Sequence, residues 1–373
     1  MKEVNVFTNG DSRRLSTWSN VPYFFTETLL SKGLKVNRVD LSPSRPLQEL
    51  FNRNFRQSIN KNSTFEYFRS PTHFADVRRR IKVAVDQFPR SEANIFLTFS
   101  FSSAGLSDKP SIQFCDWTYD HFLKYRVGRI PDALEEECIK REDSQIEGSD
   151  LVISLFPSVM EYMKERYKNE NICYLGNVIN SVYDVSEDQA LEHKEKSNNI
   201  LFVGSRKYYQ GAYALLHAFH RAKQQLPNMK LHIIGMNATD FQSLPKDTHC
   251  YGYLDKGSVA GRELYYKLLR DAKLFVNTTP KWGAFSASIE AMYHYIPVIV
   301  SPYSDFVKTF GTSINFGDYC KENTPGSIKE SILRLFNDSE YNSLCINAHN
   351  AVKEYTWSNY IDKLIQKVEI DLG

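Results

Sequence analysis

Short apolar runs alternate with longer amphipathic segments along the whole chain. The runs are four to six residues long and rich in Val, Ile, Leu and Phe, and the segments between them have the length of helices. This alternation is typical of parallel sheets whose strands are joined by crossover helices, so it predicts an α/β fold. The predicted strands of the first half are residues 4–8, 34–39, 94–99, 111–115, 151–154 and 172–175.

The second half repeats this scheme after a polar interruption at residues 181–199. The interruption predicts a boundary between two domains, residues 1–180 and 199–356. Both are predicted to be doubly wound, Rossmann-like domains facing a central cleft, with ligands at the carboxyl ends of the strands. The predicted strands of this half are residues 200–203, 230–234, 274–277 and 297–300, together with a short strand near Tyr251. One helix is predicted at residues 262–271, and another is predicted to include Glu290.

Composition and charge narrow the class of protein. The 373 residues include 46 Lys and Arg against 44 Asp and Glu, a net charge of +2, so overall charge does not indicate a polyanionic partner. The six cysteines are scattered singly without metal-ligand spacing, and we expect them to be reduced and buried. We find no secretion signal and no apolar run of the roughly 18 residues that span a membrane. We therefore expect a cytoplasmic protein, either free or peripheral on the inner face of the cell membrane.

The segment FVGSRKYYQG, residues 202–211, predicts a phosphate-binding loop. A buried strand ends at Gly204, and Ser205, Arg206 and Lys207 come directly before a helix, where backbone N–H groups are free. Cations at this point stabilise a diphosphate as it leaves, and so favour the transition state of a transfer reaction. The alternative is that Arg206 and Lys207 are two solvated loop charges.

The segment NTTPKWGAFSASIEAMYHYIPVIVSP, residues 277–302, predicts a second strand-loop-helix-strand unit. Its small residues allow a ligand to approach backbone donors closely. Glu290 lies in a largely apolar helix, so its carboxylate must reach a cleft or find a partner, and the hydroxyls of a ribose are one such partner. The alternative is an ordinary solvated or salt-bridged helix carboxylate.

The order of FVGSRK, HIIG, YGYL, LLRDAKLFVNTT and GAFSASIEAMYHYIPVIV resembles the donor domain of family 4 (group 1) glycosyltransferases. The resemblance implies a GT-B fold and a nucleotide-sugar donor whose sugar is transferred with retention of configuration. Glu290 matches the second Glu of the family motif, with Gly283 and Pro297 in register. The resemblance covers most of the chain, and its motifs are strongest in the second half.

The sequence departs from the family pattern at the donor site. Trp282 stands where the family has its first Glu, and Ser205 and Gln210 stand where it has the Arg and Lys of the phosphate loop. We assign the roles of those cations to the neighbouring Arg206 and Lys207. The predicted donor-binding residues are Gly204, Ser205, Gln210, Trp282, Gly283, Phe285, Ser286 and Glu290, and the predicted catalytic residues are Asp116, Arg206 and Lys207.

The first half resembles the same family more faintly. The segment that begins WSNVPYFF at Trp18 is similar to the N-terminal loop and helix of the family, with Ser19 and Asn20 in place of its usual glycines. Asp116 follows a predicted strand at the position where the family often has a His or Asp facing the reacting centre. Its alternative reading is a capping residue. The final helix, residues 357–373, is similar to the family helix that packs back on the first domain.

Residues 45–90 form a basic and aromatic region outside these motifs. Ten basic and four acidic residues give it a local net charge of +6. Such a surface suits an anionic membrane or a polyprenyl-diphosphate acceptor, and we expect the run Arg78, Arg79 and Arg80 to contact acidic lipid. An ordinary solvated face is the alternative, and no nucleic-acid module accompanies the charge.

The resemblance implies a retaining glycosyltransferase that acts on a glycan or lipid-linked acceptor in envelope polysaccharide or glycolipid biosynthesis. We find no D-x-D signature and expect no metal or other cofactor, because the cationic loop can take the role of a divalent ion. A catalytically degenerate protein that binds a sugar nucleotide or a partner transferase is the main alternative. A nucleotide-sugar epimerase is a weaker one.

Overall fold

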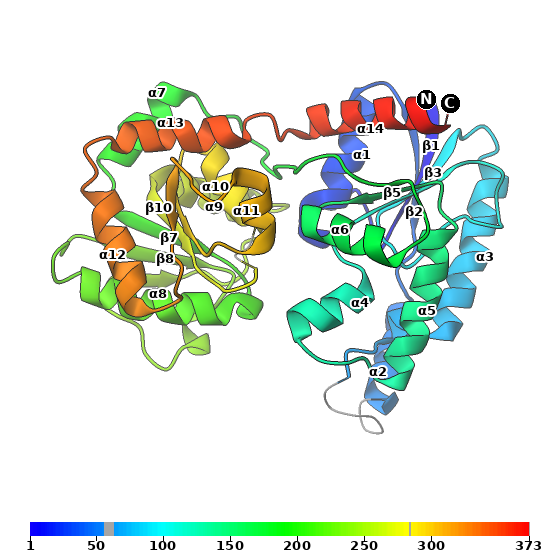
Figure 1. Ribbon diagram of the computed structural model, residues 1–373, viewed down its shortest axis with the longest axis horizontal. Helices are drawn as coiled ribbons and strands as arrows, with labels where there is room; N and C mark the ends of the chain where they lie inside the picture. The colour runs from blue at the N-terminus through cyan, green and yellow to red at the C-terminus, as the bar shows by residue number, and fades with distance from the viewer. Residues whose placement is uncertain (56–62, 283–284, 373) are drawn as a thin grey trace. The chain divides into compact units, whose positions relative to one another are not determined.

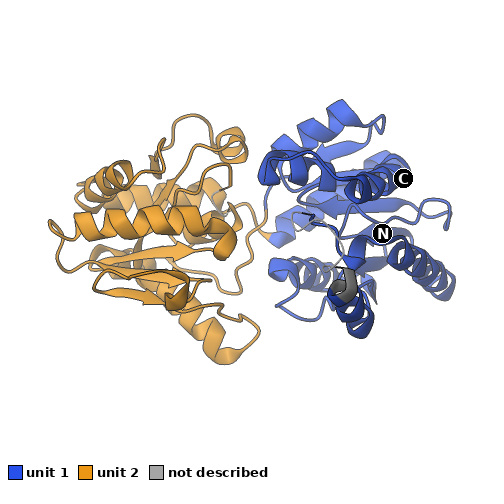
Figure 2. Ribbon diagram, turned by 90° about the horizontal axis from the view of Figure 1, so that it is seen from below, with its two compact units in different colours: residues 1–177, 357–373 blue, residues 178–356 orange. Residues whose placement is uncertain are grey.

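The chain folds into two compact units (Figure 2). The computed structural model describes residues 1–55, 63–282 and 285–372. The first unit contains residues 1–177 together with the C-terminal segment 357–373, and the second contains residues 178–356. Each unit has its own six-stranded sheet with helices on both sides, so the predicted α/β class with two doubly wound halves is confirmed.

The sheet of the first unit is parallel throughout, in the order β2-β1-β3-β4-β5-β6. Its central strands are buried on both faces, which explains why the sequence runs are continuously apolar. The strands are β1 (Glu3–Thr8), β2 (Lys35–Asp40), β3 (Ala93–Phe96), β4 (Ser111–Cys115), β5 (Leu151–Ser154) and β6 (Ile172–Tyr174).

Local sequence signals start several helices of this unit. Ser70 caps α3 and is followed by Pro71 at the first helical position, while Asp132 and Glu135 form a capping box at α5. The helices are α1 (Val21–Ser31), α2 (Arg45–Phe55), α3 (Pro71–Gln87), α4 (Tyr119–His121), α5 (Ala133–Glu147), α6 (Pro157–Arg166) and α14 (Trp357–Leu372). A six-residue π-helical segment, Phe122–Val127, follows α4.

The C-terminal helix α14 belongs to the first unit although the second unit precedes it in the chain (Figure 1). It packs on α1, where the rings of Trp357 and Phe25 lie 6.0 Å apart. Lys32 at the end of α1 donates to the carboxylate of Asp362 at 2.7 Å.

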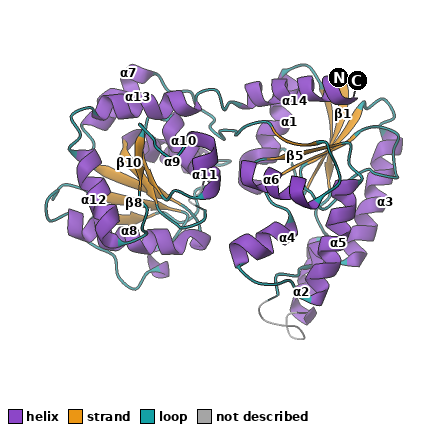
Figure 3. Cartoon of the chain, in the orientation of Figure 1, coloured by secondary structure: helices purple, strands orange, loops and turns teal. Residues whose placement is uncertain are grey.

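The sheet of the second unit is also parallel, in the order β12-β11-β10-β7-β8-β9. Helices α8 and α12 pack together on one face, over a core to which β7, β8 and β10 contribute Phe202, Ile233 and Val276 (Figure 3). The strands are β7 (Asn199–Val203), β8 (Lys230–Ile234), β9 (Thr248–Cys250), β10 (Ala272–Asn277), β11 (Val298–Val300) and β12 (Gly317–Tyr319). The helices are α7 (Glu187–Glu195), α8 (Tyr209–Ala222), α9 (Val259–Asp271), α10 (Phe285–Tyr293), α11 (Ser304–Phe310), α12 (Pro325–Phe336) and α13 (Tyr341–Val352).

Two elements of the second unit differ from the sequence expectation. The polar segment 181–199 contains α7 and belongs to the unit, because buried Lys194 donates to the carbonyls of Leu269 and Arg270 at the end of α9. Strand β12 was not expected from its sequence, GDY, which lacks an apolar run. Gly317 allows β12 to pair with β11, since a Cβ there would overlap the carbonyl oxygen of Val298.

Among the described residues, no helix has both the length and the apolar character needed to cross a bilayer.

We expect Gly235→Ala to destabilise the second unit. Gly235 follows β8 with φ of +97°, and an added Cβ would lie 2.6 Å from the carbonyl oxygen of Gly204. A loss of about 1–3 kcal/mol in the free energy of unfolding is expected, measured by chemical denaturation. Gly326→Ala in α12 is the matched control, because its added Cβ would have no atom within 4 Å apart from its chain neighbours and the backbone of its own helix. Equal effects of the two substitutions would contradict this account of the β8 turn.

Candidate functional site

The carboxyl ends of β7 and β8 form the base of the candidate site in the second unit. The backbone N–H of Gly204 donates to the carbonyl of Ile234 at 2.9 Å, and that of Gly235 donates to the carbonyl of Gly252 at 2.7 Å. After Gly204 the chain forms a short turn, Arg206–Tyr208, and then enters α8. The predicted phosphate loop therefore lies between a strand end and a helix start, the arrangement that presents backbone donors to anions.

The side chains of this loop are exposed. Ser205, Arg206, Lys207 and Gln210 all reach solvent, and the Arg206 side chain is 79% exposed. The guanidinium of Arg206 lies 3.3 Å from the carboxylate of Asp240. An anionic ligand at this loop therefore competes with Asp240 for Arg206.

The loop between β10 and α10 meets the phosphate loop. The indole N–H of Trp282 donates to the hydroxyl of Tyr208 at 2.5 Å, and the hydroxyl of Thr279 donates to the carbonyl of Tyr208 at 3.4 Å. The side chain of Asn323 donates to the carbonyl of Gln210 at 3.3 Å. Segments about 70 and 110 residues apart in the chain are thus joined at one edge of the sheet.

The start of α10 carries two more predicted donor-binding residues, Phe285 and Ser286. The ring of Phe285 is buried and lies 5.6 Å from that of Phe306, so it is part of the core and offers a ligand only its backbone. Ser286 is exposed in the first turn of the helix. Gly283 lies outside the described residues.

Glu290 is buried and accepts four hydrogen bonds from side chains of the second unit. The ammonium of Lys256 lies 2.7 and 2.9 Å from its two carboxylate oxygens, and the hydroxyls of Tyr265 and Tyr266 donate at 2.9 and 3.2 Å. Burial raises the pKa of Tyr265 well above its usual value, so this phenol remains a donor. We call Glu290, Lys256, Tyr265 and Tyr266 the Glu290 cluster.

The Glu290 cluster also holds the first residues of the second unit. Lys256 donates to the carbonyl of Asn180 at 3.2 Å, and the hydroxyl of Tyr266 accepts from the backbone N–H of Val182 at 3.0 Å. Lys256, Tyr265 and Tyr266 were not predicted from the sequence. Lys256 is 34 positions from Glu290, so neither the helical nor the strand period links them.

Comparison with known proteins identifies this unit. The family model described as glycosyl transferases group 1 matches residues 185–352, nearly all of the second unit. The second unit is a group 1 glycosyl transferase domain. No curated protein sequence matches the chain.

Solved structures share the fold of the whole chain. Sucrose-phosphate synthase from Thermosynechococcus elongatus has 14% sequence identity and a TM-score of 0.69, with 99% of each chain covered. WaaG, a glycosyltransferase involved in lipopolysaccharide biosynthesis, has 13% identity and a TM-score of 0.66, with 100% of each chain covered. Anabaena HepE, solved in complex with UDP and glucose, has 11% identity and a TM-score of 0.64, with 99% of each chain covered. The fold is GT-B and, with the family match, indicates a glycosyltransferase that uses a nucleotide-sugar donor.

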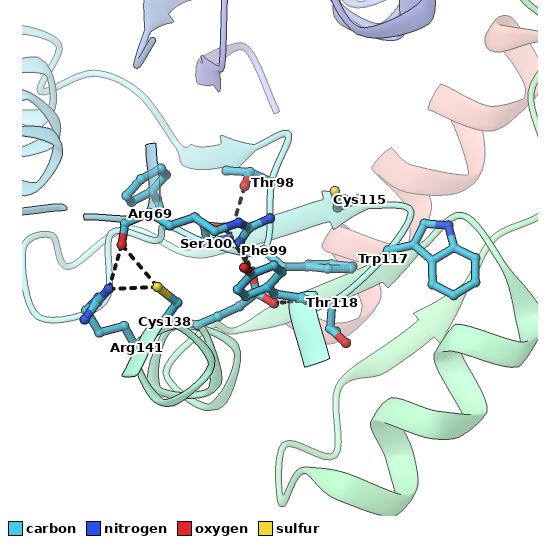
Figure 4. Close-up of polar contacts among 12 residues, drawn as sticks. Arg69, Thr98, Phe99, Ser100, Cys115, Trp117, Thr118, Cys138 and Arg141 are labelled. Atoms are coloured by element: carbon cyan, nitrogen blue, oxygen red, sulfur yellow. Dashed lines mark hydrogen bonds and ion pairs between the residues drawn. The ribbon is translucent and has the colours of Figure 1, made fainter. Parts of the chain in front are cut away.

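In the first unit of this glycosyltransferase, Asp116 lies at the carboxyl end of β4. Its carboxylate accepts from the backbone N–H of Trp117 at 2.9 Å and from the thiol of Cys115 at 3.4 Å. Asp116 is half-buried and is not the N-cap of α4, since that position is Thr118, whose hydroxyl accepts from the backbone N–H of His121. Trp117 follows on the loop and extends away from the other labelled side chains (Figure 4).

The three consecutive arginines of α3 have different surroundings. Arg80 donates to the carbonyls of Asp40 and Leu41, and so fixes the chain after β2. Arg79 pairs with Asp76 at 2.8 Å on the surface. Arg78 is half-buried and lines a pocket between α3 and α5. The run is therefore not one uniform basic patch.

We expect Lys256→Met to lower the free energy of unfolding of the second unit by about 3–5 kcal/mol, because it leaves the Glu290 carboxylate buried without a cation. The double variant Lys256→Met with Glu290→Gln removes both charges and should recover much of this loss. Chemical denaturation followed by circular dichroism measures both effects.

The control for this prediction is Lys267→Met, which breaks the solvent-exposed pair with Asp271 on α9. It should cost no more than about 1 kcal/mol. If Lys256→Met costs no more than this control, the Lys256–Glu290 pair does not carry the stability assigned to it.

Proposed function

We propose that this glycosyltransferase moves a sugar from a nucleotide-sugar donor to a glycan or lipid-linked acceptor with retention of configuration. The observation that carries the proposal is the contact of the loop at Gly204–Tyr208 with Trp282, through Tyr208, at the strand ends of a group 1 domain. HepE was solved with UDP and glucose, which are a nucleoside diphosphate and a sugar, the two components that we assign to the donor. The role of WaaG in lipopolysaccharide biosynthesis supports envelope polysaccharide or glycolipid synthesis as the pathway.

In this mechanism the acceptor hydroxyl attacks the anomeric carbon on the face from which the nucleoside diphosphate leaves. The bond to the diphosphate breaks, a bond to the acceptor oxygen forms, and the proton of the acceptor hydroxyl passes to the leaving diphosphate. Arg206 and Lys207 neutralise the charge that develops on the leaving diphosphate, a stabilisation that is greatest in the transition state. Asp116 at the end of β4 is assigned to the hydroxyls of the reacting sugars, and we expect no divalent ion to be required.

Glu290 is assigned to the ribose of the donor. Its carboxylate already accepts from Lys256 and two tyrosines, so ribose hydroxyls must replace one of these donors. Replacement of a tyrosine exchanges one neutral donor for another and keeps the ion pair, so it costs less than displacement of Lys256. We therefore expect Lys256 to stay on Glu290 when the donor is bound.

The second candidate function is a degenerate binding protein that holds a sugar nucleotide or a partner transferase without turnover. Trp282 favours it, because the residue stands in place of the Glu that contacts the donor sugar in the family and its indole cannot accept a hydrogen bond from a hydroxyl. Hydrolysis of the donor by the purified chain distinguishes the two functions, since only an enzyme releases the sugar.

We expect donor binding to raise the melting temperature of the chain in a nucleotide-selective way, because a ligand that binds only the folded state stabilises it. The measurement is a thermal shift with UDP-, GDP-, ADP-, CMP- and dTDP-linked sugars. The double variant Arg206→Ala, Lys207→Ala should lose most of the shift, because these cations are assigned to the diphosphate of the donor. Both side chains are exposed, so their loss should not disturb the core.

Its matched control is Arg221→Ala with Lys230→Ala, which removes two exposed cations elsewhere in the unit. The control should keep the wild-type shift. Absence of a shift with all five donors, together with absence of hydrolysis, would argue against both the site and the enzyme.

We also propose that the half-buried Arg78 and the exposed Arg79 of α3 help the first unit contact an anionic membrane. Arg78→Ala with Arg79→Ala should weaken binding to phosphatidylglycerol vesicles by about 2 kcal/mol, roughly thirty-fold, while Arg80 is kept for its carbonyl contacts. Vesicle co-sedimentation at two salt concentrations measures the effect. Binding that is undiminished and independent of salt would refute the proposal.

A further inference from the structure

A pocket of about 380 Å³ lies between α3 and α5 in the first unit. Phe74 and Ala104 contribute its apolar lining, and Arg78, Arg141, Ser144 and Gln145 contribute polar side chains. Its volume is within the range of pockets that bind small molecules. Two half-buried guanidinium groups that share one pocket favour an anionic ligand, because each can donate charge-assisted hydrogen bonds to it.

The acidic side chains nearest in sequence are paired with other cations. Asp76 pairs with Arg79, and Asp143 pairs with Arg166 at 2.6 Å. Burial raises the pKa of Glu142, and the cation nearest to its carboxylate is Arg69 at 3.9 Å. Within the described part of the chain, no carboxylate pairs with Arg78 or Arg141. Glu137 pairs with Lys140 at 2.9 Å and also interacts electrostatically with Arg141, so the protein compensates the positive charge of the pocket only in part.

Arg141 is held in position before any ligand arrives. Its guanidinium donates to the carbonyl of Arg69 at 2.6 Å and to the thiol of Cys138 at 3.2 Å (Figure 4). It also lies 6.0 Å from the centre of the Phe74 ring. The carbonyl and thiol occupy one of its nitrogens, Nη2, and leave other N–H groups for a ligand.

Gln145 and Ser144 supply neutral donors beside the two arginines. The amide oxygen of Gln145 accepts from Ser102 at 3.0 Å, which leaves the NH₂ group as the free end of the side chain. Ser144 is exposed and its hydroxyl can donate. The polar lining thus consists of donors around two positive charges, which matches an acceptor-rich anion.

We propose that this pocket binds a phosphoryl group, as a phosphomonoester or a diphosphate. Planar guanidinium groups bind phosphate oxygens through paired N–H donors, and the volume accommodates a phosphorylated sugar. All of the residues of this pocket belong to the first unit, whereas the donor loop belongs to the second. The phosphoryl group comes either from a soluble phosphorylated carbohydrate or from a lipid headgroup.

The test measures binding of pyrophosphate and glucose 6-phosphate by isothermal titration calorimetry. It uses the Arg206→Ala, Lys207→Ala background, so that the donor loop does not contribute. Arg78→Gln should weaken binding at least tenfold, and the matched control Arg79→Gln, which removes the same charge one residue away, should change it less than twofold. Arg141→Lys keeps the charge but loses the planar fork, and should also weaken binding.

Vesicles with and without phosphatidic acid distinguish the two sources. Arg78-dependent binding of the soluble probes assigns a soluble ligand, whereas Arg78-dependent binding to phosphatidic acid vesicles alone assigns a headgroup. Absence of binding to probes and vesicles, or equal losses in Arg78→Gln and Arg79→Gln, would overturn the proposal. The proposed transferase function is tested separately, by donor-induced thermal shifts that do not involve Arg78. Failure of the phosphoryl pocket therefore leaves the transferase function unaffected.

Discussion

The close approach of the Gly204 and Gly235 backbones sets the geometry on which the candidate donor site depends. Both glycines follow neighbouring parallel strands, and a Cβ at Gly235 would meet the carbonyl of Gly204 at 2.6 Å. Gly235 has no Cβ, so its backbone can lie against the carbonyl of Gly204. The chain then turns directly from β7 towards α8 and leaves backbone N–H donors at the strand end. The cations of the loop and Trp282 then lie at the same edge of the sheet.

Charge compensation is organised differently in the two units. In the second unit, Lys256 and two tyrosine hydroxyls donate hydrogen bonds to the buried Glu290, so both carboxylate oxygens have partners within the protein. In the first, Arg78 and Arg141 share a pocket without a carboxylate. A buried ion pair resists exchange with a ligand, whereas cations that have no ion-pair partner favour binding of an anion. An anionic ligand is therefore expected to gain more electrostatic free energy at the arginine pocket of the first unit than a ligand gains at Glu290.

The Glu290 cluster links the donor domain to its own first residues. Lys256 and Tyr266 contact Asn180 and Val182, which directly follow the first unit in the chain. A substitution in this cluster therefore affects both the proposed ribose contact and the anchoring of the connecting segment. Variants of Glu290 need the paired change at Lys256 before their effects on donor binding can be interpreted.

The sequence by itself determined the α/β class, the strands β4, β5 and β8, and the loop after Gly204, because apolar runs and glycine positions are local properties. It did not predict β12, whose pairing depends on the missing Cβ of Gly317 rather than on an apolar run. Only the tertiary structure decided that Glu290 pairs with Lys256. It also decided that Arg79 and Arg80 share Asp76, and that Arg80 alone of the two donates to the carbonyl of Leu41. Contacts between residues far apart in the chain follow from how helices pack on the sheet, and no local period encodes them.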